Sequence, residues 1–224
     1  MDKIAKNLEK REKNELIALV KHMVLQEPNL QWLLTTSLPT PSSEKTSADP
    51  KIYQQQVLAA MAAGDYPRKP ARHEVERRLT AIKAIADDFV KYEQYATALT
   101  IYEVLVNEII AHYNDYRDEY IAFSVVLTAC IDGLDACFAG ETDNQKIRLR
   151  VLQALFAIFR FYTDSSMDLD EDIPGLLVGN TTAEEHHIIA GWARDALAEA
   201  RNKKWITGYE MGKYHSLLQA LNKQ

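Results

Sequence analysis

Residues 79–113 have the sequence LTAIKAIADDFVKYEQYATALTIYEVLVNEIIAHY, which contains neither proline nor glycine. Apolar side chains recur in it every three or four residues, first from Ile82 to Phe89 and again from Leu99 onward. This spacing places them on one face of a helix. We therefore predict two amphipathic helices, joined by a tight turn near Tyr95.

The rest of the chain repeats this pattern. Residues 71–173 contain no proline, and glycine occurs there only at Gly133 and Gly140. A stretch this long with so few helix breakers favours consecutive long helices. No segment shows a sustained alternation of apolar and polar residues, which would indicate a strand. The sequence thus predicts an all-α protein.

Residues 35–50, TTSLPTPSSEKTSADP, are the clearest linker. They contain three prolines, and most of their other residues are Ser, Thr or charged. Such a composition buries too little surface to offset the entropy of ordering the chain. We expect N-terminal helices in residues 1–34 and a helical domain in residues 51–224, with residues 14–34 packed on that domain.

Several helix boundaries can be assigned from capping residues. Asp49 precedes Pro50, a favourable first helical residue. Thr142 with Gln145, and Thr182 with Glu185, match the capping-box pattern. We expect the last helix to direct a set of large side chains towards the core: Trp205, Tyr209, Tyr214, Leu217 and Leu221.

Composition and charge argue against some classes of protein. The net charge of -6 disfavours binding to nucleic acid through overall charge. The longest nearly apolar run, Tyr120–Ile131, is shorter than the about 20 residues that span a membrane, so we expect a buried core helix. The N-terminus is highly charged and lacks the apolar region of a secretory signal. Together with two predicted buried free thiols, Cys130 and Cys137, these features indicate a cytoplasmic protein.

The phrase YEQYATALTIYEVL, within the opening stretch, resembles the turn and second helix of a tetratricopeptide repeat. Ala86, Phe89, Ala98 and Tyr102 fall at compatible spacings. The family's first-helix tryptophan, glycine and closing proline are replaced by other residues: Ile82, Ala86 and Ile110. The match covers about one repeat. It implies antiparallel helical hairpins, stacked as a short tetratricopeptide-like solenoid or as an irregular bundle.

Most of the chain also resembles uncharacterised bacterial all-helical proteins and regions, some of them found beside SWIM-type zinc fingers. The matching features are Glu27-Pro28-Asn29-Leu30, Tyr53, Leu79–Tyr113, Asp164–Asp172, Pro174–Leu177 with Thr182–Glu185, and Trp205. The cysteines and histidine of the zinc finger are absent. The resemblance therefore implies a fold and carries over no zinc site and no catalytic activity.

Two patterns suggest a metal site without completing one. The acidic run Asp164–Asp172 contains the alternating aspartates of a calcium loop, but Ile173 stands where that loop needs glycine and Gly179 where it needs glutamate. A solvated loop with helix-capping charges explains the run more simply. Glu184 and His187 form a single E-x-x-H pair, whereas di-iron bundles use two. We expect Glu185 and the neighbouring histidines on a solvent-facing first turn.

A basic stretch and one helix face are the candidate binding residues. The stretch contains Arg68, Lys69, Arg72, Arg77 and Arg78. It suits an acidic or phosphate-bearing partner, although interleaved Glu74 and Glu76 equally suit an exposed, charged helix. If helix pairs form a concave groove that binds a peptide, four further residues are expected to line it: Lys83, Asp87, Lys91 and Asn107.

From these features we predict a non-enzymatic helical-repeat protein, without cofactor or metal, that acts as a protein–protein interaction scaffold or regulatory subunit. One alternative is a metal-dependent helical-bundle enzyme that uses Glu184 and His187. Another is a nucleic-acid-binding accessory protein that uses the stretch Arg68–Arg78. The sequence does not identify the partner.

Overall fold

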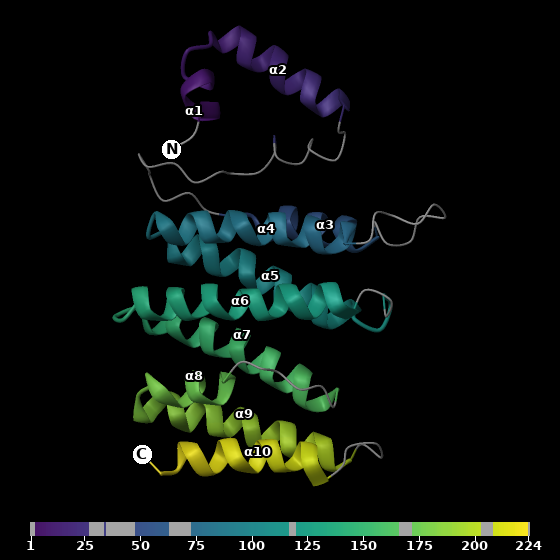
Figure 1. Ribbon diagram of the computed structural model, residues 1–224. Coiled ribbons are helices and arrows are strands. Elements are labelled where there is room, and N and C mark those ends of the chain that lie inside the picture. The colour runs from purple at the N-terminus through teal and green to yellow at the C-terminus, as the bar shows by residue number, and fades with distance from the viewer. Residues whose placement is uncertain are drawn as a thin grey trace. The chain divides into compact units, whose positions relative to one another are not determined.

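The computed structural model of the protein is built from α-helices (Figure 1). It describes residues 3–26, 34, 48–62, 73–116, 120–165, 172–202 and 208–223. These residues form helices α1 to α10 and contain no strand. The prediction of an all-α protein is confirmed. The chain divides into two compact units, residues 1–38 and residues 39–224.

The N-terminal unit contains α1 (Lys3–Leu8) and α2 (Lys13–Gln26). The α2 helix begins at Lys13, within the residues 1–34 where N-terminal helices are expected. Its apolar side chains are partly or fully exposed, including Val20 and Met23. Leu34 is described in the segment that follows, but most of the predicted linker, residues 35–47, lies outside the described residues.

The C-terminal unit contains the other helices: α3 (Pro50–Met61), α4 (Glu74–Lys91), α5 (Tyr95–His112), α6 (Tyr120–Gly140), α7 (Gln145–Asp164), α8 (Ile173–Gly179), α9 (Ala183–Arg201) and α10 (Gly208–Leu221). Among α3 to α7, every pair of helices one or two places apart in the chain packs together. Beyond α7, the helices α8, α9 and α10 pack on α7 and on one another. Packing therefore runs between near neighbours in the chain, as Figure 1 shows.

The α4–α5 hairpin is the predicted opening pair of helices. Its turn occupies residues 92–94, so the predicted break near Tyr95 is confirmed. Glu93 has a left-handed backbone (φ 58°), and the Gln94 N–H donates to the Phe89 carbonyl at 2.9 Å. This bond satisfies a carbonyl group at the end of α4. Phe89 and Tyr102, which the tetratricopeptide pattern singled out, are both fully buried.

Two tyrosines of α5 pack against two glycines of α6. The ring of Tyr102 fills the space that a Cβ on Gly133 would occupy, and the ring of Tyr95 does the same at Gly140. The absence of a side chain at these two positions lets each ring lie directly against the α6 backbone. The α6 helix also ends at Gly140.

The α6 helix is the core helix that its apolar run predicts. Among the described helices it alone is long and apolar enough to cross a membrane, but 56% of its most apolar stretch is buried inside the protein. Phe123, Leu127 and Leu134 are fully buried. Cys130 and Cys137 are free and buried, as expected. Length and composition alone are weak grounds for a membrane span, and this burial is what a core helix requires.

Two of the predicted helix starts are confirmed and one is wrong. The Asp49 carboxylate accepts from the Lys51 N–H at 2.9 Å, ahead of Pro50 in α3. Thr182 and Glu185 form the complete capping box of α9. The start of α7 was misassigned to Thr142, because Asn144 caps that helix instead. Asparagine is as good a cap as threonine, and Asn144 lies closer to the first buried residue of the helix.

The last helix differs from its prediction in one side chain. Tyr214, Leu217 and Leu221 are buried, as expected. Tyr209 is 62% exposed, so its assignment to the core was wrong. It lies in the first turn of α10, where its ring is 5.0 Å from the Lys213 ammonium. Trp205 lies outside the described residues.

Candidate interaction surface

The basic stretch is only partly described. Arg68, Lys69 and Arg72 lie outside the described residues, while Arg77 and Arg78 are on α4. Both of these arginines bind the Glu74 carboxylate, with the Arg77 Nη2 at 2.8 Å and the Arg78 Nε at 2.6 Å from Oε1. The hydrogen bond from Arg77, together with that from Arg78, lowers the pKa of Glu74. The described part thus has the pairing expected of an exposed, interleaved helix.

The three candidate groove residues of α4 form ion pairs within that helix. The Lys83 ammonium lies 3.0 Å from the Asp87 carboxylate, and the Lys91 ammonium lies 2.7 Å from Asp88. Asp87 also accepts a hydrogen bond from the Tyr102 hydroxyl at 2.6 Å. Burial and this bond raise the pKa of Tyr102. Asp87 therefore anchors a buried tyrosine of α5 in addition to pairing with Lys83, whose side chain is 17% exposed.

Asn107 does not share a face with the α4 candidates. It is exposed on α5, five residues after Tyr102. At 3.6 residues per turn, this separation rotates it by about 140° from the side of α5 that meets Asp87. The structure therefore brings Lys83, Asp87 and Lys91 together along α4 and leaves Asn107 on another side of the hairpin.

Polar side chains connect alternate helices of the C-terminal unit. Between α3 and α5, the Gln54 amide donates to Glu108 at 2.7 Å. Between α5 and α7, the Arg150 Nε donates to Glu103 at 2.9 Å. Between α7 and α9, Arg160 pairs with Glu199. The partners in each pair are distant in sequence, so their positions alone did not predict these contacts.

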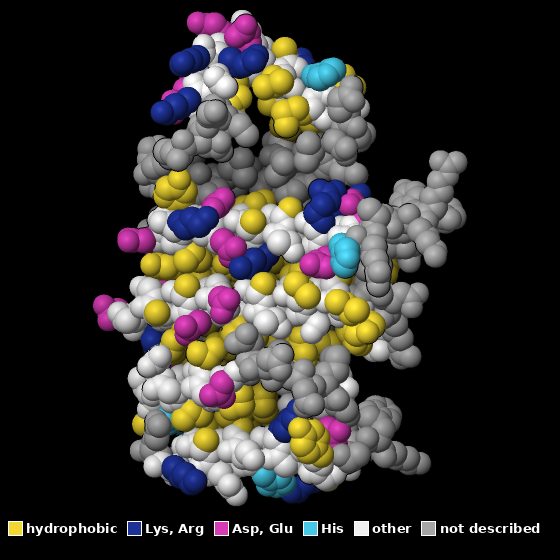
Figure 2. Space-filling model, viewed as in Figure 1, with side chains coloured by type: hydrophobic (Ala, Val, Ile, Leu, Met, Phe, Trp, Pro, Cys, Tyr) yellow, Lys and Arg dark blue, Asp and Glu magenta, His cyan; other side chains and the backbone are white. Residues whose placement is uncertain are grey.

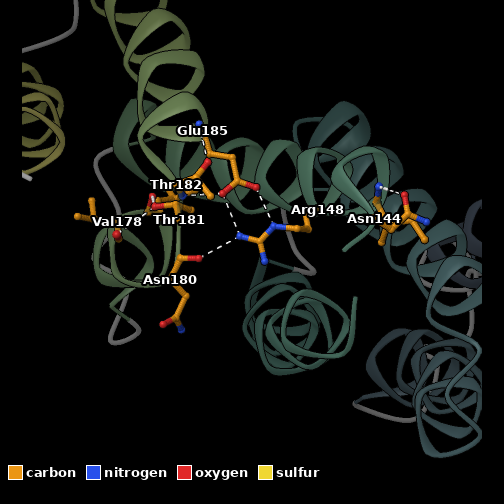
Figure 3. A network of polar contacts seen from close by, with 9 residues as sticks. Asn144, Arg148, Val178, Asn180, Thr181, Thr182 and Glu185 are labelled. Carbon is orange, nitrogen blue, oxygen red and sulfur yellow. Dashed lines mark hydrogen bonds and ion pairs between the residues drawn. The ribbon is translucent and has the colours of Figure 1, made fainter. Parts of the chain in front are cut away.

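Arg148 and Glu185 form the most buried of the ion pairs between helices (Figure 3). The Arg148 Nε and Nη2 lie 2.8 and 2.9 Å from the two oxygens of the Glu185 carboxylate. The same Nη2 donates to the Asn180 carbonyl at 3.0 Å. Glu185 also accepts from the Thr182 N–H at 2.8 Å. This fork holds α7 against α9 and the segment before it.

The environment of Glu185 sets its charge. Burial alone would raise the pKa of its carboxyl, but the hydrogen bonds from Arg148 and Thr182 outweigh burial, and the pKa is lowered. The expectation that Glu185 and its neighbouring histidines face solvent was wrong for Glu185 and His186, which are both buried. The His186 ring contacts the Val178 carbonyl at 3.2 Å. Packing on α7 and α8 overrides the usual exposure of a helix's first turn.

The E-x-x-H residues lie on the outside of α9, where both Glu184 and His187 are exposed. Within the described ranges, no group of three or more His, Cys, Asp and Glu side chains is placed to hold a metal ion.

The acidic run Asp164–Asp172 is described only near its ends. Asp172 caps α8 by accepting from the Gly175 N–H at 2.9 Å, the capping role considered from the sequence. Asp164 accepts from the Tyr214 hydroxyl at 2.7 Å. Residues 166–171 lie outside the described residues. Both described ends of the run therefore have structural roles.

The comparisons with known proteins assign no family to the chain. No protein-family model matches it, and no curated protein or solved structure matches it significantly.

Proposed function

We propose that the C-terminal unit is a short helical-repeat solenoid that serves as a scaffold for another protein. The order of helix packing supports this proposal. Among α3 to α7, every pair of helices one or two places apart in the chain packs together, which is the pattern of stacked hairpins. Such stacks present long helix faces side by side, and these faces bind peptides or helices of partner proteins.

The chemistry of the interior favours a scaffold over an enzyme. Burial raises the pKa of the Cys130 and Cys137 thiols to about 12, so neither is activated as a nucleophile. Asp87 and Asp164 hold the buried tyrosines Tyr102 and Tyr214. Glu185 binds Arg148. These buried polar groups are thus engaged in joining helices.

The resemblance to tetratricopeptide-like regions beside SWIM-type zinc fingers supports the fold part of this proposal, the stack of helical hairpins. We place the scaffold role in the cytoplasm, where free buried thiols such as Cys130 stay reduced.

Capture and reconstitution test the function. The full chain is used as bait in an extract of cells that express it, and the captured proteins are identified by mass spectrometry. Each candidate partner is then purified and mixed with the purified chain. The scaffold function predicts a complex of fixed stoichiometry between the two purified proteins.

Two results would contradict the proposal. One is that no captured protein forms a complex when both components are pure. The other is that protein purified without chelator contains stoichiometric iron, manganese or zinc, which would favour the metal-dependent bundle. Elemental analysis of the same preparation provides this second measurement.

A further inference from the structure

The outer face of α6 combines exposed apolar side chains with uncompensated acidic ones. Its residues Ile121 and Val125 are 56% and 44% exposed. Thr128, Asp132 and Asp135 continue the same stripe towards the C-terminal end of the helix, within an arc of about 80° at 3.6 residues per turn. We call the residues Ile121, Val125, Thr128, Asp132 and Asp135 the α6 stripe. It lies opposite the face that is buried in the core.

Residues 120–144 themselves supply only negative charge, and the Arg148 guanidinium of α7 lies over the Phe138 ring on the buried side of α6. From Tyr120 to Asn144 the chain has no Lys, Arg or His, whereas Asp132, Asp135, Glu141 and Asp143 are acidic. In Figure 2, hydrophobic side chains gather towards one end of α6 and acidic side chains lie towards the other. The stripe thus changes from apolar to acidic along about 16 Å of helix, from Ile121 to Asp132 at 1.5 Å per residue.

The acidic residues of the stripe, Asp132 and Asp135, lie in the C-terminal half of α6. Among the described residues neither carboxylate forms an ion pair or a hydrogen bond. A cationic partner would supply the complement that these two carboxylates lack.

We propose that the α6 stripe is the docking surface for a basic amphipathic helix of a partner protein. Two apolar side chains of that helix contact Ile121 and Val125, and its Lys or Arg side chains face Asp132 and Asp135. The matching partner has apolar and basic residues at the same helical spacing as the stripe. The proposal rests on the scaffold function and specifies its surface and the chemistry of its partner.

The negative charge of the α6 stripe favours a basic helix over other binding partners. Nucleic acids and anionic membranes would be repelled by the four carboxylates of residues 120–144. A second copy of the chain would bring an identical acidic stripe to the surface, and like charges in close contact oppose association. A basic helix satisfies both the apolar and the acidic parts of the stripe.

Synthetic helical peptides test the proposal. The probe is a fluorescein-labelled peptide of Leu, Lys and Ala with two leucines four residues apart and two lysines at the spacing of Asp132 and Asp135. It is made in both sequence directions, and a twin of each peptide has Glu in place of Lys. Binding to the full chain is measured by fluorescence anisotropy at low and at high salt.

We expect a lysine peptide to bind and its glutamate twin to bind at least about tenfold more weakly. The double variant Asp132→Lys/Asp135→Lys should lose about tenfold or more in affinity for the lysine peptide. Ile121→Ser/Val125→Ser should lose about fivefold, because the apolar contact is removed. Added salt should weaken the wild-type complex.

The matched control is Glu184→Lys/Asp195→Lys, which makes the same change in net charge at two exposed positions of α9. It should leave the affinity within about twofold of wild type. Equal loss in both double variants would show attraction to overall charge and overturn the proposal. So would failure of the lysine peptides to bind, or equally tight binding of the glutamate twins.

The test of the α6 stripe can fail while the scaffold function is supported. A captured partner that reconstitutes with the chain, yet binds the Asp132→Lys/Asp135→Lys variant as tightly as wild type, overturns the α6 stripe and leaves the scaffold standing. Sedimentation of the chain alone tests whether a second copy of the chain binds the stripe. Self-association through the stripe would also contradict the proposal.

Discussion

Gly133 lies in the middle of α6, where the Tyr102 ring occupies the space that a side chain would need. At Gly191 of α9 and Gly212 of α10, by contrast, a Cβ would meet no atom within 4 Å. Glycine is a poor helix former, so alanine is preferred at an open helical site by about 1 kcal/mol. At Gly133 the steric cost of placing a methyl group against the Tyr102 ring outweighs that preference.

We predict that Gly133→Ala lowers the free energy of unfolding by about 1–3 kcal/mol, because overpacking forces Tyr102 or α6 to shift. The control Gly191→Ala should leave stability unchanged or raise it by up to about 1 kcal/mol. Urea denaturation followed by circular dichroism measures both. A Gly133→Ala protein as stable as Gly191→Ala would show that Tyr102 does not depend on this contact.

The buried fork of Arg148 and Glu185 makes a second prediction for single residues. Glu185→Gln should cost about 3 kcal/mol of unfolding free energy, because it breaks a buried pair and leaves Arg148 without its countercharge. Glu184→Gln, at the exposed neighbouring position, should change stability by less than about 0.5 kcal/mol. Equal effects of the two substitutions would contradict the role of the fork.

The same carboxyl gives a pH dependence. Its pKa is lowered in the folded state, so its contribution to stability is present above the unfolded pKa of about 4.3 and is lost as the pH falls through the folded pKa. The difference in stability between wild type and Glu185→Gln should therefore be constant near neutral pH and shrink below about pH 4. Denaturant titrations over this pH range measure it, and a constant difference would contradict the assignment.

At the scale of single elements, α6 is a core helix whose two cysteines are sealed from solvent. Burial raises the pKa of both thiols to about 12. We predict that a thiol reagent at about pH 8 modifies neither cysteine rapidly in the native protein and modifies both once denaturant unfolds it. Rapid modification of native Cys130 would show that α6 is not packed as described.

Helix positions were predictable from local sequence, whereas contacts between helices were not. Asp49 and Thr182 bond to backbone groups within a few residues, so their capping roles follow from spacing alone. Arg148 and Glu185 are 37 residues apart, and nothing in the sequence pairs them. The capping box did identify Glu185 as important, but its burial depends on how α9 packs on α7.

The candidate binding residues show the same division. The helical period placed Lys83, Asp87 and Lys91 along one side of α4, where the structure has them. Asn107 was grouped with them because helical repeats place such residues along one groove. How α5 is rotated against α4 decides its position, and the sequence does not show that rotation. The exposed stripe of α6 was missed, because an apolar run by itself gave no sign of which residues face outward. The absence of basic residues from 120 to 144 was the available signal.

At the scale of the whole molecule, the proposed linear stack of the C-terminal unit makes a test of cooperativity possible. We predict that Leu217→Ala in α10, which removes a buried side chain at about 2–5 kcal/mol, speeds amide hydrogen exchange in α9 and α10. Exchange in α3, α4 and α5 should be unchanged, since α10 packs on α7, α8 and α9. Faster exchange throughout the unit would indicate a closed bundle.

The paired tyrosines and glycines of α5 and α6 also fix the alignment of these helices. Tyr95 and Tyr102 are seven residues apart, as are Gly133 and Gly140, and the two pairs match in antiparallel order. A slip of one residue would press both rings against side chains at once. A shift of seven residues would place only one ring against a glycine and would press the other against a residue such as Val126. Both rings therefore fit against a glycine in only one alignment of α5 with α6. The main consequence is that misaligned packing of these two helices is disfavoured during folding.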